Sequence, residues 1–161
     1  MIIGILKDIK EGENRVIATP GEVATLIGDG NVVKVQKGAG ARAGFEDEAY
    51  AAAGATLVDT AEEIYGTCEF VAKVKEFEPS EYGMLREGLI VFTCIHPAAH
   101  PEEVQVLLDK KVTAFTAEDS HRYGSPNCEA AGKQGALFGL ESMLTINGGK
   151  GKFVSGLGGA P

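Results

Sequence analysis

Two unbroken apolar runs constrain the fold of this chain most: IIGIL at residues 2–6 and LIVFTCI at residues 89–95. A strand that is buried on both faces of a parallel sheet has this composition, because neither face meets water. Elsewhere along the chain, shorter strand-like segments alternate with helix-compatible segments. Such alternation favours parallel pairing through right-handed crossovers. The sequence therefore predicts an α/β fold, a flavodoxin-like open parallel sheet with helices on both faces.

Local signals place the individual elements. Thr19 and Pro20 suit the N-cap and the first position of one helix, and Thr60 suits the N-cap of another. Asn147, followed by two glycines, is expected to end the last helix. The predicted strands cover residues 2–6, 32–35, 55–58, 70–74, 89–95 and 112–116. The predicted helices cover residues 20–28, 46–53, 61–65, 80–86, 101–109 and 128–146.

Net charge and cysteine usage exclude several classes of protein. The 161 residues carry a formal net charge of −8, which disfavours binding to nucleic acid or to an anionic membrane surface. Cys68, Cys94 and Cys128 are odd in number and widely spaced, which argues against a disulfide framework and for the cytoplasm. They are interpreted as small buried hydrophobes, although a nucleophilic role for Cys94 stays open. No His or Cys pair has the spacing of a metal site.

Three cationic side chains stand in loops that follow predicted strands: Arg15, Lys75 and His96. Taken singly, Arg15 is a solvated loop residue, Lys75 a surface cation beside Glu76 and Glu78, and His96 a structural histidine. Taken together, the three residues favour a ligand-binding site, because the carboxyl ends of parallel strands share the rim where ligands bind. Arg can hold a carboxylate, Lys can polarise a carbonyl, and His can move a proton near neutral pH. The three predict a site for a small 2-oxo acid.

Two glycine-rich stretches could be mistaken for phosphate-binding loops. Residues 38–44, GAGARAG, contain GxGxxxG rather than GxGxxG and follow the second predicted strand. We interpret them as a mobile surface loop. The tail at residues 148–159 lacks a following helix and is interpreted as a hinge. No dinucleotide-binding loop is therefore expected in this chain.

Several motifs carry a resemblance to a known family. IGILKDIKEGENRVIATP, GAGARAGFEDEAYAAAGA, KVKEFEP and TCIHPAA together resemble the N-terminal half of the alanine dehydrogenase / nicotinamide nucleotide transhydrogenase alpha-subunit family. Lys75 and His96 favour the dehydrogenase branch, because the transhydrogenase branch typically lacks both. The resemblance implies a substrate-binding lobe at residues 1–127. At residues 128–161 it implies a connecting helix and a Gly-rich hinge toward a nucleotide-binding domain that is absent from this chain.

The resemblance also implies an activity and roles for single residues. The activity is the reversible conversion of L-alanine, water and NAD to pyruvate, ammonium and NADH. NAD would be bound mainly by the absent domain, so the chain alone is expected to be inactive. By resemblance, Arg15 and Lys75 bind the carboxylate and carbonyl region of the substrate. His96 bonds the carbonyl oxygen and assists proton transfer, and Glu118 matches an acidic position near the pocket.

The resemblance has limits. Cys128 stands where the family usually has a Ser that approaches the cofactor, so this contact is not carried over. Complete members of the family form hexamers or dimers, so a homo-oligomer is expected of the complete protein. One alternative is a stand-alone oxo-acid-binding module, or a subunit that pairs with a separate nucleotide-binding chain. Another is a related amino-acid dehydrogenase of the saccharopine or carboxyalkyl-amino-acid type.

Overall fold

The computed structural model describes residues 1–118 and 125–151. The chain divides into two compact units, Met1–Ala117 and Glu118–Pro161, and each unit is described by itself. The predicted boundary after residue 127 stays a prediction.

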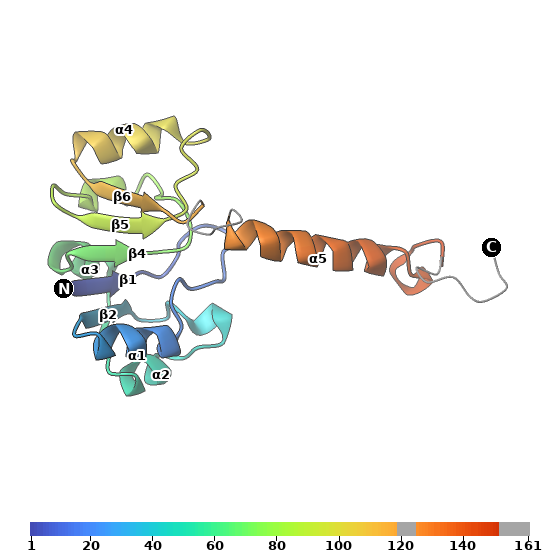
Figure 1. Ribbon diagram of the computed structural model, residues 1–161, viewed down its shortest axis with the longest axis horizontal. Helices are drawn as coiled ribbons and strands as arrows, with labels where there is room; N and C mark the ends of the chain where they lie inside the picture. Colours follow the sequence, from blue (N-terminus) through green and yellow to red (C-terminus); the bar gives the residue numbers. More distant parts are fainter. Residues whose placement is uncertain (119–124, 152–161) are drawn as a thin grey trace. The chain divides into compact units, whose positions relative to one another are not determined.

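The first unit is built on a six-stranded sheet in which every observed pair is parallel (Figure 1). The strands are β1 (Ile2–Ile5), β2 (Val32–Gln36), β3 (Thr56–Val58), β4 (Phe70–Ala72), β5 (Ile90–Thr93) and β6 (Thr113–Thr116). Their spatial order is β3-β2-β1-β4-β5-β6. The prediction of an open parallel α/β sheet is confirmed. The order reverses between β1 and β4, with three strands on each side, and such a switch point is where ligands bind in open sheets.

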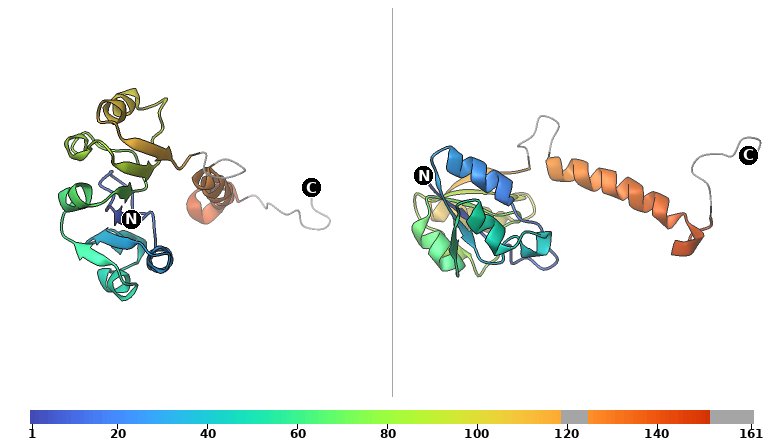
Figure 2. Two further views of the ribbon diagram at one scale, coloured as in Figure 1. Left: turned by 60° about the vertical axis from the view of Figure 1, so that its left-hand side comes forward. Right: turned by 90° about the horizontal axis from the view of Figure 1, so that it is seen from below.

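Helices cover both faces of the sheet, as the sequence predicts (Figure 2). On one face lie α1 (Pro20–Gly28) and α2 (Asp47–Ala52), and on the other lie α3 (Ala61–Thr67) and α4 (Pro101–Asp109). Two hydrophobic clusters follow from the alternation of side chains along each strand. Ile3, Ile5 and Val35 belong to the α1 side, whereas Val71 and Val91 belong to the α3 side.

Capping residues explain where the helices begin. The Glu22 carboxylate accepts the backbone N–H of Thr19 at 2.8 Å, and Pro20 fills the first position of α1. The Thr60 hydroxyl accepts the N–H of Glu63 at 3.2 Å, which caps α3. The predicted N-caps of both helices are thereby confirmed.

One predicted helix, at residues 80–86, is only a 3₁₀ turn at Tyr82–Met84. The reason is that the Glu81 side chain turns into the protein instead of remaining on a solvated helix face. Its carboxylate pairs with Lys73 at 2.6 Å and accepts the Tyr65 hydroxyl at 2.8 Å. These buried contacts of Glu81 stabilise the 3₁₀ turn more than helix propensity stabilises a helix in this segment.

The loop at residues 38–44 forms a short 3₁₀ turn at Ala41–Ala43 and is partly buried. A Cβ on Gly40 would lie 2.6 Å from the Tyr50 hydroxyl, so this close approach requires glycine. The backbone N–H of Gly38 donates to Asp47 at 2.7 Å. The loop is thus packed against α2 as a structural connection.

The second unit contains α5 (Pro126–Ser142) and a 3₁₀ turn at Thr145–Asn147. The helix predicted at residues 128–146 is confirmed in its main part. The predicted hinge falls largely on residues 152–159, which lie outside the described residues. Along the described ranges, no helix has both the length and the apolar character needed to cross a membrane.

Candidate functional site

The loops that follow β1, β4 and β5 meet at the switch point of the sheet. Asp8, in the first loop, is buried and accepts the backbone N–H of Lys75 at 2.8 Å and of Lys10 at 3.1 Å. The buried Thr93 hydroxyl, at the end of β5, donates to the Lys75 carbonyl at 2.6 Å. Both backbone polar groups of Lys75 are therefore held by side chains, one from the loop after β1 and one from β5. These bonds fix the start of the Lys75 side chain at the rim.

A buried carboxylate, Glu76, gathers the cations of this rim. Glu76 is only 4% exposed. Its Oε2 lies 3.7 Å from Lys75 Nζ and 3.5 Å from His96 Nδ1. Its Oε1 lies 3.6 Å from His100 Nε2 and also pairs with Lys10 Nζ. One carboxylate thus contacts and orients side chains from three loops.

The backbone of His96 is unusual. Its φ is +49°, in the left-handed region that non-glycine residues seldom occupy, and Pro97 follows directly. The carbonyl of His96 accepts the N–H groups of Ala99 at 2.8 Å and His100 at 3.1 Å. The rings of His96 and His100 meet edge to face, with centroids 6.4 Å apart. This turn directs both imidazoles toward Glu76, and strained backbone of this kind is typical of functional sites.

Arg15 is held in a fixed orientation by Glu13. Its Nε donates to Glu13 Oε1 at 2.9 Å and its Nη2 to Oε2 at 2.6 Å. This hydrogen-bonded pairing lowers the pKa of Glu13, and the charge of Lys75 lowers that pKa further. The same pairing raises the pKa of Arg15, with smaller contributions from Cys94 and Asp8. These electrostatic contacts place Arg15 in the neighbourhood of Lys75 and of the end of β5.

A buried ion pair stabilises the loop after β4. Lys73 and Glu81 are both buried, 2.6 Å apart, and the Lys73 ammonium lies 5.5 Å from the centre of the Phe77 ring. Burial raises the pKa of Tyr65, whose hydroxyl donates to Glu81. Glu81 also accepts the backbone N–H of Glu78 at 2.8 Å. The network ties both ends of the segment that carries Lys75 and Glu76.

The structure brings Lys75 and His96 together around Glu76 and places Arg15 nearby. Glu118 follows β6 and begins the second unit, so its place near this site stays a prediction. Cys94 is buried, as the hydrophobe interpretation expects, whereas Cys128 is exposed on α5. Roles for these residues remain predictions.

Sequence reasoning missed Glu76 as a functional residue. In the sequence it appears only as an acidic neighbour of Lys75, typical of a surface ion pair. It is buried among side chains from the loops after β1, β4 and β5, and no local sequence pattern reveals that these loops meet. The available signal was its place directly after Lys75, in the loop beyond a buried strand.

Cations arranged in this way can bind and polarise a small anion. A guanidinium binds carboxylates through paired hydrogen bonds, and an ammonium beside an imidazole can stabilise charge that develops on a carbonyl oxygen. Among the described residues, no group of three or more His, Cys, Asp or Glu side chains could hold a metal ion. The ammonium and the imidazole of this rim suit electrostatic and acid–base chemistry.

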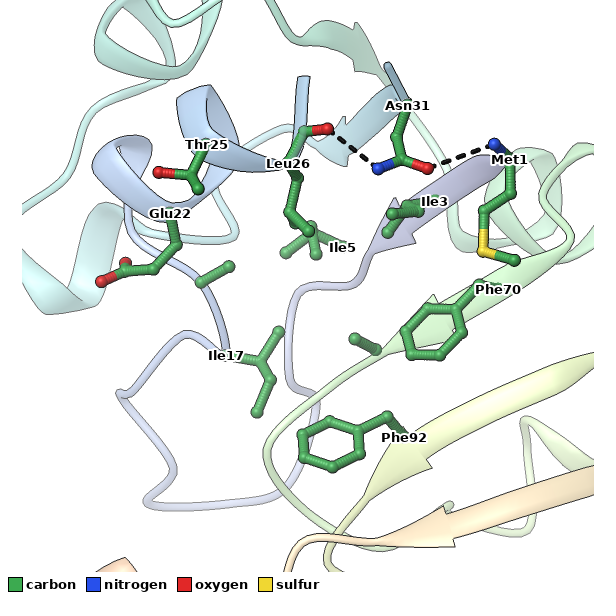
Figure 3. Close-up of a pocket in the computed structure, with 12 residues that line it drawn as sticks. Met1, Ile3, Ile5, Ile17, Glu22, Thr25, Leu26, Asn31, Phe70 and Phe92 are labelled. Carbon is green, nitrogen blue, oxygen red and sulfur yellow. Dashed lines mark hydrogen bonds between the residues drawn. The ribbon is translucent and has the colours of Figure 1, made fainter. Parts of the chain in front are cut away.

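A separate apolar cavity of about 550 Å³ lies on the α1 face of the sheet (Figure 3). Phe70, Phe92, Ile17 and Leu26 line it, and Asn31 links the N-terminal amine to the Leu26 carbonyl at its edge. None of the rim cations lines this cavity. Most of its lining is apolar, and its polar side chains are Glu22, Thr25 and Asn31.

Comparisons with known proteins agree with the fold and the motifs. The family model described as "Alanine dehydrogenase/PNT, N-terminal domain" matches residues 4–127. Alanine dehydrogenase of Bacillus subtilis is 43% identical over 99% of this chain and 43% of its own length. Alanine dehydrogenase of Methanococcus maripaludis is 39% identical over 99% of this chain and 44% of its own length.

Solved structures show the same architecture. An L-alanine dehydrogenase superposes with a TM-score of 0.88 at 34% identity, covering 99% of this chain and 46% of the other. A transhydrogenase from Sinorhizobium meliloti superposes with a TM-score of 0.71 at 26% identity, covering 76% of this chain and 36% of the other.

The fold and the rim of charged side chains define an open parallel α/β domain with a candidate ligand site at the switch point of its sheet. The chain belongs to the alanine dehydrogenase/PNT family and carries its N-terminal domain. It spans less than half the length of the curated relatives it matches.

Proposed function

We propose that this chain is the substrate-binding lobe of an NAD-dependent alanine dehydrogenase, which interconverts L-alanine and pyruvate. The observation that carries the proposal is the convergence of Lys75 and His96 on the buried Glu76 at the switch point of the sheet. The similarity to alanine dehydrogenases over nearly the whole chain supports the same reaction class.

The geometry suggests a role for each cation. Arg15 binds the substrate carboxylate, because Glu13 already holds its guanidinium in one plane. Lys75 donates to the carbonyl oxygen and stabilises the negative charge that develops there. His96 faces Glu76 through Nδ1, so we assign its Nε2 to the substrate oxygen and to proton transfer. Glu76 contacts Lys75 and His96 and acts as a positioning residue.

The described residues do not fit a tightly bound dinucleotide. A dinucleotide loop needs glycines between β1 and the next helix, so that the pyrophosphate can approach the helix N-terminus. Here residues 6–19 contain a single glycine, Gly12, and include Asp8 and Glu13, whose carboxylates would repel a pyrophosphate. We therefore assign the binding of NAD, which would supply hydride transfer, to a part of the protein outside this lobe.

Pyruvate titration of the ¹⁵N-labelled chain, followed by NMR, tests the proposal. We expect saturable shifts of the backbone amides of Lys75, Glu76 and His96. Lys110→Gln, which removes an exposed cation at the far end of α4, is the control and should bind pyruvate like the wild type. Shifts confined to the apolar cavity, or no saturable shifts at all, would overturn the proposal.

A further inference from the structure

His100 is a second histidine of the rim, and no role proposed above uses it. It directly precedes Pro101, the first residue of α4, and its side chain is 41% exposed. Its backbone N–H donates to the His96 carbonyl at 3.1 Å, so the two histidines belong to one turn. The His100 side chain can therefore be replaced without opening the hydrophobic core.

The two histidines share Glu76 through its two oxygens. Oε2 lies 3.5 Å from His96 Nδ1, and Oε1 lies 3.6 Å from His100 Nε2. The centroids of the two rings are 6.4 Å apart. Lys10 and Lys75 contact the same carboxylate. A positive charge on one ring therefore opposes a positive charge on the other, because the two repel and draw on one negative charge.

Further charged groups face the two rings. Lys75 lies beside His96, and the titratable groups around Lys75 and Arg15 include Asp8, Glu13 and Cys94. Burial raises the pKa of Glu103 to about 6, so this carboxyl also changes charge near neutral pH. All of these groups are common to the variants compared below, so a difference between those variants reports on residue 100. On the side of His100, one cavity is lined by ionisable side chains from the loops after β1 and β4 and from the first turn of α4: Lys10, Glu76, Glu78, Tyr82, Glu102 and Glu103.

The charge on His96 decides whether its Nε2 can donate a hydrogen bond. A neutral imidazole carries one N–H, and a carboxylate beside Nδ1 holds that proton at Nδ1. Nε2 is then an acceptor. It donates only when the ring carries both protons. The oxo oxygen of pyruvate is itself an acceptor, so its hydrogen bond from Nε2 requires the charged ring.

We propose that His100 is a positioning residue that, through the shared Glu76, sets the pH range in which His96 can donate to the oxo group of the substrate. The inference rests on the proposed function, in which Nε2 of His96 meets the substrate oxygen. A neutral His100 leaves more of the negative charge of Glu76 to His96, and a cationic His100 draws on part of it.

Calorimetric titration with pyruvate across neutral pH tests this inference in His100→Gln and His100→Lys, which fix residue 100 as neutral or as cationic. In both variants the affinity should fall as pH rises and His96 loses its charge. Two unit charges at the separation of these rings repel enough to move the midpoint of this fall by about 0.5–2 pH units. We expect the midpoint to be higher by this amount in His100→Gln, with the wild type between the two variants.

Two controls isolate the effect. Lys110→Gln removes an exposed cation at the far end of α4 and should keep the wild-type midpoint. Propionate lacks the oxo group, so its pH profile should differ less between His100→Gln and His100→Lys. A merely structural role of His100 would change the affinity at every pH without moving the midpoint. Equal midpoints in the two variants, the opposite order, or an equal difference with propionate would overturn the inference.

A pH titration of the His96 ring resonances by NMR, without pyruvate, separates this inference from the proposed function. The His96 ring should titrate at higher pH in His100→Gln than in His100→Lys. Pyruvate binding together with equal ring titrations in the two variants overturns only the role of His100. Failure of pyruvate to bind the wild type at any pH overturns the proposed function, and the ring titration then decides the sharing of Glu76 by itself.

Discussion

The Nδ1 atom of His96 lies 3.5 Å from Oε2 of Glu76, a carboxylate that follows a different strand and is almost completely buried. The same oxygen lies 3.7 Å from Lys75 Nζ. The contact between Glu76 and His96 joins the loops after β4 and β5 near the place where the strand order reverses. Glu76 therefore links two side chains that the strand pattern predicts at one site, through a buried contact that the pattern does not predict.

Replacing Glu76 by Gln should destabilise the first unit. The substitution keeps the shape of the side chain but removes the counter-charge shared by Lys10 and Lys75 and the contacts of two histidines. We expect a loss of about 1–3 kcal/mol in the free energy of unfolding, measured by urea denaturation at pH 7. Glu78→Gln is the control, because Glu78 is more exposed and makes one long contact at 3.9 Å. Equal losses for the two variants would contradict a special role for Glu76.

Replacing Arg15 by Ala should weaken pyruvate binding. A hydrogen-bonded contact between two charged groups contributes about 1.5–3 kcal/mol, so we expect at least about tenfold weaker binding by calorimetry. Arg15→Lys retains the charge without the planar fork and should recover only part of the affinity. Wild-type affinity in Arg15→Ala would remove Arg15 from the site.

Replacing Glu103 by Gln should raise stability at neutral pH. The folded-state pKa of Glu103, about 6, lies above its ordinary value of 4.5 because burial disfavours the charge. The folded chain therefore binds more protons between these two values, and stability falls as pH rises through this window. Above this pH window, the buried charge of Glu103 lowers the free energy of unfolding by about 2 kcal/mol at most, and Glu103→Gln removes that cost. Urea denaturation should show the gain at pH 7.5 and little gain at pH 4; a gain independent of pH would contradict this cause.

Replacing Lys73 by Met should be strongly destabilising. The substitution leaves Glu81 buried without its cation, which costs about 3–5 kcal/mol for pairs of this kind. Lys34→Met breaks a more exposed ion pair with Glu63, at 4.0 Å, and should cost about 1 kcal/mol or less. Thermal unfolding of the two variants compares these effects directly. A loss no greater for Lys73→Met than for Lys34→Met would contradict the structural role of the buried pair.

The elements with strong local signals were predictable from the sequence. Both α1 and α4 begin at a proline, Pro20 and Pro101, and their observed bounds agree with the predicted helices at residues 20–28 and 101–109. The strand predicted at residues 89–95 is longer than the observed β5, because apolar residues continue into the turn that leads to His96. Composition alone does not reveal where an apolar segment leaves a sheet.

The candidate site was only partly predictable. The positions of Arg15, Lys75 and His96 after strands follow from the strand pattern and the parallel sheet. The buried charges Lys73, Glu76 and Glu103 do not, because charged residues normally signal solvent and their burial depends on tertiary packing. The carboxylates that organise the site thus emerge only from the assembled loops.

The most direct test of the account asks whether Lys75 recognises the oxo group of the substrate. Calorimetry would compare pyruvate with propionate, which lacks the oxo group, for the wild type and for Lys75→Met. We predict that the wild type binds pyruvate at least about tenfold more tightly than propionate, and that this preference largely disappears in Lys75→Met. An equal preference for pyruvate in both proteins would contradict the assignment of this rim as a 2-oxo-acid site.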